Sequence, residues 1–84
     1  MIDRNELWRE LERSLTSLVQ SMSTSVDKKT LWLLKDYIDN REYGLALESL
    51  YDAIVDLRTE LSPHQKQEIE RLAGLMQISL PSRN

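Results

Sequence analysis

The chain has 84 residues and a net charge of −3, with no cysteine, one histidine, two glycines and two prolines. The absence of cysteine excludes disulfides, thiolate metal sites and thiol enzymes, and one histidine cannot supply a His-pair metal motif. No apolar run approaches the ~20 residues that a membrane span needs, and the charged beginning MIDRNELWRE is unlike a signal peptide. So few turn-forming residues argue against a many-stranded fold. We therefore expect a cytoplasmic, all-α protein: one domain over residues 1–84, folded as a compact bundle of about four helices with short loops.

The first helix is predicted over residues 3–22. Asp3 is a typical N-cap residue, and Glu6 follows it in the register of a capping box. Apolar side chains then recur at steps of three and four, the spacing of one buried helix face. They are Leu7, Leu11, Leu15, Leu18 and Met22. The serine-rich residues 21–25 favour a loop, because serine hydroxyls compete for backbone hydrogen bonds.

The second helix is predicted over residues 26–40, with Ser25 or Asp27 as its cap. Apolar side chains cover most of its circumference. They are Leu31, Trp32, Leu33, Leu34, Tyr37 and Ile38. This pattern has two interpretations: the helix is sandwiched between two others, or part of its surface is left for a partner. The base rate for apolar helices in so small a bundle favours the first.

The third helix is predicted over residues 42–60, after a polar turn. Its inward positions are Tyr43, Leu47, Leu50, Ile54 and Leu57. Gly44 lies in its first turn, and glycine costs about 1 kcal/mol against alanine in a helix interior. Two interpretations follow, close packing at Gly44 or a glycine that is merely tolerated.

The fourth helix is predicted over residues 63–77, because Ser62, Pro63 and Gln65 form a capping box with proline at the first helical position.

The acidic excess of the chain is concentrated in the central hairpin. Residues 35–62 hold seven acids and three bases, whereas residues 1–34 are neutral. On the third helix Glu48, Asp52 and Asp56 repeat at steps of four, where like charges repel by a few tenths of a kcal/mol. Such a face disfavours nucleic acid as a ligand and favours a basic protein partner, although acidic runs also serve solubility alone.

No arrangement of residues typical of an enzyme is found in the sequence. His64 has no nucleophile or base placed beside it by sequence. Asp36 and Asp39 are paired carboxylates, but a di-iron bundle also needs Glu-x-x-His on two helices. A DNA-reading helix would not carry Glu48, Asp52 and Asp56. We therefore expect a non-enzymatic protein without metal or cofactor.

Two of the tyrosines lie among acids in the sequence. Trp8 and Tyr43 are expected in the core or half-buried, as is usual in bundles. Tyr37 is next to Asp36, and Tyr51 is next to Asp52. A tyrosine among carboxylates is a common anchor for a basic protein surface; ordinary partial burial is the alternative.

Residues 35–54 (KDYIDNREYGLALESLYDAI), followed by residues 61–76 (LSPHQKQEIERLAGLM), resemble the MafI-like family of small helical immunity proteins. These proteins belong to bacterial polymorphic-toxin systems of the contact-dependent growth inhibition type. The resemblance lies in an acidic turn, the E-Y-G-L-A-L-E motif of residues 42–48, a Leu-Ser cap, and a final helix of the type x-x-I-x-x-L-A. It covers residues 34–76, and residues 1–25 resemble no family.

The resemblance implies a cytoplasmic antidote that binds and neutralises one cognate toxin, often a nuclease. A nuclease needs a basic cleft for phosphates, so an acidic inhibitor would meet complementary charge. We expect the toxin to contact Asp36, Asp39, Glu48, Tyr51, Asp52 and Asp56. The alternative is a helical adaptor or regulatory subunit that inhibits no toxin. A third interpretation is a homodimer in which the second helix packs on its twin through Trp32 and Leu33.

Overall fold

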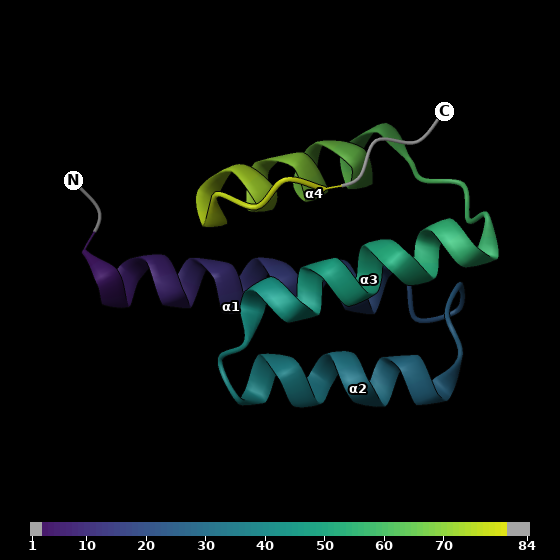
Figure 1. Cartoon of the computed structure of the whole chain (residues 1–84), viewed down its shortest axis with the longest axis horizontal. Helices are drawn as coiled ribbons and strands as arrows, with labels where there is room; N and C mark the ends of the chain where they lie inside the picture. Colours follow the sequence, from purple (N-terminus) through teal and green to yellow (C-terminus); the bar gives the residue numbers. More distant parts are fainter. Residues whose placement is uncertain (1–2, 81–84) are drawn as a thin grey trace.

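The structure is a computed structural model that describes residues 3–80 (Figure 1). These residues form the helices α1 (Arg4–Ser21), α2 (Lys28–Asp39), α3 (Tyr43–Leu57) and α4 (Pro63–Met76). No strand occurs among the described residues. The all-α bundle predicted from the sequence is confirmed.

The helix α3 lies at the centre of the bundle and packs against each of the other three helices. The helices α2 and α3 form an antiparallel hairpin, α1 passes behind α3, and α4 lies on the far side of α3 from α2 (Figure 1). In contrast, α2 packs on α1 and α3 only. One side of α2 is therefore left uncovered within residues 3–80.

The helix beginnings follow the capping residues of the sequence. The side chain of Asp3 accepts a hydrogen bond from the backbone N–H of Glu6 at 2.9 Å. Asp27, rather than Ser25, caps α2 by accepting from the N–H of Thr30 at 2.8 Å. At α4, the Ser62 hydroxyl accepts from the Gln65 N–H at 3.1 Å while the Gln65 side chain accepts from the Ser62 N–H at 2.9 Å. This reciprocal pair is the predicted capping box.

The helix α3 ends three residues earlier than predicted. Arg58 adopts a left-handed conformation with φ of 51°, and the N–H of Thr59 donates to the carbonyl of Ile54 at 3.1 Å. These features close the helix by a Schellman-type arrangement. The prediction that Leu57 points inward was wrong, because Leu57 is 55% exposed. Leu57 is the last residue of α3, and this end of the helix is where the chain leaves the hairpin for α4 (Figure 1).

Apolar side chains from all four helices, mostly leucine and isoleucine, form one core. Its largest fully buried members are Leu15, Met22, Leu34, Leu47, Leu50, Ile54 and Leu72. Tyr43 is buried and Trp8 is half-buried, as expected. The favoured interpretation of α2 as a sandwiched helix was wrong, since Trp32 is 68% exposed and Leu33 is 38% exposed. The helices α1 and α3 cover only the side of α2 that carries Leu34 and Ile38.

Of the two interpretations of Gly44, the structure supports close packing. After α4 the chain turns at Gln77, and the Ile78 N–H donates to the Ala73 carbonyl at 2.9 Å. A Cβ at Gly44 would lie 3.2 Å from the Cδ1 atom of Ile78. Glycine therefore allows the segment after α4 to approach the first turn of α3.

Polar side chains join α4 to α1 across the surface of the core. The guanidinium of Arg71 donates to both oxygens of Glu68, at 2.8 and 3.0 Å, to Glu10 at 3.3 Å and to the Ser14 hydroxyl at 2.8 Å. Ser14 is buried and in turn donates to Glu10 at 3.2 Å. The hydrogen bond of Arg71 lowers the pKa of Glu68 below its ordinary value. This network satisfies the polar groups at the α1–α4 contact.

Candidate functional site

Three of the predicted partner-binding residues lie together on the outer side of α3. Glu48, Asp52 and Asp56, which we call the acidic row, are all exposed. They follow one another at steps of four, so each step advances about 6 Å along one side of the helix. The buried residues of α3 occupy the opposite side. They are Tyr43, Ala46, Leu47, Leu50 and Ile54. The acidic row therefore points away from the core.

The carboxylates of the acidic row have no cationic partner inside the described chain. The ion pairs among residues 3–80 join only Arg13 to Glu10 and Arg71 to Glu10 and Glu68. Repulsion along the row is thus not offset by an ion pair within the fold. A basic surface brought against α3 would find all three carboxylates available.

Leu45 is a member of this surface that the sequence analysis did not identify. It lies three residues before Glu48, on the same side of α3, and is 47% exposed. An apolar side chain beside charged ones suits the centre of a protein interface, where contacts are desolvated. The signal was present in the sequence, because Leu45 falls outside the inward set of α3 on a helical wheel.

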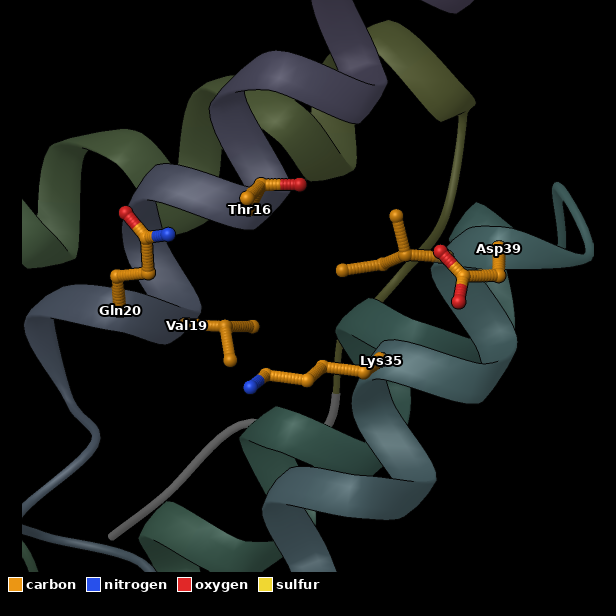
Figure 2. A pocket seen from close by; sticks show the side chains of 6 residues that line it. Thr16, Val19, Gln20, Lys35 and Asp39 are labelled. Carbon is orange, nitrogen blue, oxygen red and sulfur yellow. The ribbon is translucent and has the colours of Figure 1, made fainter.

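The two predicted acids of α2 do not join the acidic row. Asp39 lines a groove of about 220 Å³ between α1 and α2. The groove is lined by Thr16, Val19, Gln20, Lys35, Ile38 and Asp39, with no residue of α3 (Figure 2). The Lys35 side chain extends into this groove toward α1 (Figure 2). Asp36 faces solvent, where the Asn40 amide lies 3.4 Å from its carboxylate.

The predicted tyrosine of the site lies on another flank of α3. Tyr51 is half-buried and packs against the core. It is close to Gly44 on the helical wheel, on the flank that meets Ile78 from the segment after α4. Tyr37 is also half-buried against the core. The ring of Tyr51 therefore has a packing role.

A basic site that the sequence analysis missed surrounds Trp8. The guanidinium carbons of Arg4 and Arg41 lie 5.7 and 5.5 Å from the ring centroid, within cation–π range. Arg41 has a positive φ of 60° in the α2–α3 turn. At the same site, the hydroxyl of the buried Tyr43 donates to the Glu12 carboxylate at 3.5 Å. Burial, and then the charge of Glu12, raise the pKa of Tyr43. Nothing local in the sequence links Arg4 to Arg41.

The described residues contain no group of three or more His, Asp or Glu side chains that could hold a metal ion. His64 is exposed at the start of α4. Within residues 3–80, none of the helices combines the length and apolar character needed to cross a bilayer.

Comparisons of the chain with models of protein families, with curated proteins and with solved structures find no match. The outer side of α3 is therefore the best-defined candidate site on the molecule.

Proposed function

We propose that this protein is a cytoplasmic immunity protein that binds and neutralises a cognate bacterial toxin, with a nuclease as the favoured class. The observation that carries the proposal is the acidic row of α3, which is exposed and has no cationic partner within residues 3–80. The resemblance of residues 34–76 to MafI-like proteins supports the same function. In this proposal the protein inhibits by binding and performs no chemistry of its own.

The charge of the row explains how an inhibitor of this kind would recognise a nuclease. The phosphate-binding cleft of a nuclease is basic, so Glu48, Asp52 and Asp56 would meet complementary charge there. Long-range attraction would also speed association, an effect that salt reduces. Leu45 would supply the apolar contact beside the row. Asp36, Asp39 and Tyr51 are proposed as peripheral contacts, because Asp36 and Asp39 lie on α2 and Tyr51 is half-buried against the core.

The family motif is assigned to the fold rather than to toxin binding. Tyr43, Ala46 and Leu47 are buried, and Gly44 is covered by Ile78. Changes at these positions would act through stability. The exposed members of the same motif, Leu45 and Glu48, are the ones that can contact a partner.

The test is charge reversal of the acidic row. Glu48→Lys, Asp52→Lys and Asp56→Lys together should abolish protection of cells that express the toxin encoded beside this gene, while leaving helicity by circular dichroism unchanged. The matched control reverses three other exposed acids, Glu6, Glu60 and Glu70, and so changes the net charge equally. We expect the control variant to protect and to co-purify with the toxin.

Two results would contradict the proposal. If the row variant still protects, the acidic row is not part of the mechanism. If the wild-type chain co-purifies with a non-toxic partner instead, the protein is the adaptor or regulatory subunit named above as the alternative.

A further inference from the structure

The uncovered side of α2 carries four residues that lie on one helix face. They are Lys29, Trp32, Leu33 and Asp36, which we call the α2 stripe, and their spacing of i, i+3, i+4 and i+7 places them together. Trp32 at 68% and Leu33 at 38% exposure are its apolar centre. A tryptophan so exposed is uncommon, because its large ring is usually well buried in a monomer. The stripe thus has an apolar centre with a lysine at one end and an aspartate at the other.

The α2 stripe is complementary to the same stripe of a second copy whose helix runs antiparallel to it. Lys29 precedes Trp32 by three residues, and Asp36 follows Leu33 by three residues. A two-fold axis that passes midway between Trp32 and Leu33 would therefore place the tryptophan of each copy opposite the leucine of the other, and the lysine of each opposite the aspartate of the other. A two-fold interface needs a surface of this kind, in which residue i contacts residue j and j contacts i.

The charges of α2 are also arranged against the dipole of their own helix. Lys28 and Lys29 lie in the first turn, and Asp36 and Asp39 lie in the last. A helix normally favours acids at its N-terminus and bases at its C-terminus. Asp27 offsets the lysines at the cap, but neither Lys29 nor Asp36 forms an ion pair within residues 3–80. An antiparallel neighbour would bring each charged end beside its opposite.

We propose that the α2 stripe binds a second copy of this chain, in an antiparallel two-fold dimer. Trp32 of each copy packs on Leu33 of the other, and Lys29 of each copy pairs with Asp36 of the other. The contact centres on one exposed helix side, so the dimer is a small interface that dissociates on dilution. This inference goes beyond the proposed function. The acidic row lies on α3, outside the stripe, and remains available in each copy. Of the proposed peripheral toxin contacts, Asp36 is taken up by the dimer.

The test is the solution mass of the full chain over a wide concentration range, by analytical ultracentrifugation. The wild type should pass from monomer to dimer, whereas Lys29→Glu and Asp36→Lys should each remain monomeric, because like charges then meet at both ends of the interface. Trp32→Ala should weaken the dimer by about tenfold or more, as expected for a central aromatic contact. The control is Glu48→Lys, which should leave the dimer unchanged.

Mixing experiments identify the antiparallel pairing. An equimolar mixture of the Lys29→Glu and Asp36→Lys chains should form a heterodimer, and one chain that carries both substitutions should regain the homodimer. The wild type and that double variant should not mix, whereas a parallel pairing would favour their mixing. A wild type that stays monomeric at every concentration overturns the proposal, as does a dimer that these substitutions leave unchanged. These experiments measure solution mass, whereas the proposed function is tested by protection from a toxin. A failure of the dimer proposal can therefore be distinguished from a failure of the proposed function.

Discussion

Arg71 on α4 and Glu48 on α3 are both charged residues on helices that pack against α1, but the fold uses them differently. Arg71 donates to Glu68, Glu10 and Ser14, so its charge is engaged in joining two helices. Glu48 and the other acids of its row have no ion-pair partner within residues 3–80. Charges that stabilise the fold and charges that remain available for a partner thus lie on different sides of one small bundle. Because of this separation, the acidic row could change without disturbing the core.

Two leucines of α3 show the same contrast between the fold and the exposed surface. Replacing the buried one is expected to have the largest effect on stability. Leu50 is fully buried, whereas Leu45 is 47% exposed. We expect Leu50→Ala to lower the free energy of unfolding by about 2–5 kcal/mol, the range for large-to-small changes in a core. Leu45→Ala should change it by less than about 0.5 kcal/mol and should instead weaken toxin binding. Urea unfolding and a binding titration measure the two effects, and equal destabilisation by both would contradict this division of α3.

The polar network of α4 offers an intermediate effect. Arg71→Met retains the apolar stem but removes every hydrogen bond to Glu68, Glu10 and the buried Ser14 hydroxyl. We expect a loss of about 1 kcal/mol in the free energy of unfolding, because these are part-exposed, charge-assisted hydrogen bonds. Glu48→Gln should cause no loss, since it removes repulsion within the row. If Arg71→Met were neutral and Glu48→Gln destabilising, the comparison between the two sides of the bundle would be reversed.

The smallest expected effect is a dependence of stability on acid pH. The hydrogen bond from Arg71 lowers the pKa of Glu68 in the folded state. The stabilising contribution of Glu68 is therefore fully present above its unfolded pKa, which is ordinarily about 4.3. It is lost as the pH falls through the lower folded pKa. Unfolding midpoints of the wild type, measured across the acid range, should fall as this contribution is lost. In the Arg71→Met variant the midpoint should depend less on pH. An unchanged slope in that variant would show that Glu68 is not its source.

The positions of the helices could be predicted from the sequence because their signals are local. Asp3 and the Ser62–Gln65 pair cap helices through contacts only three residues apart. Steps of three and four likewise identify which side of a helix is apolar. Both kinds of signal are fixed by the geometry of a single helix, so no knowledge of its neighbours is needed.

The exposure of Leu57 and Trp32 could not be predicted in this way. Whether an apolar side is covered depends on how many helices surround it, and α2 contacts only two of the other three. Arg58 ends α3 without the glycine that usually marks a left-handed cap. For the candidate site, the row of Glu48, Asp52 and Asp56 followed from spacing alone. The separation of the row from Asp39 required the structure, because Asp39 lines the groove between α1 and α2.

The contact of Ile78 with Gly44 also has a consequence for the order in which contacts form during synthesis. Gly44 is made well before Ile78, which is among the last of the described residues to leave the ribosome. Until it does, the first turn of α3 lacks the side chain that lies 3.2 Å from a Cβ position at Gly44. The first turn of α3 therefore acquires this neighbour only after the whole of α4 has been made. Domains fold as units while the chain is synthesised, and in this protein the unit closes when the segment after α4 reaches the hairpin.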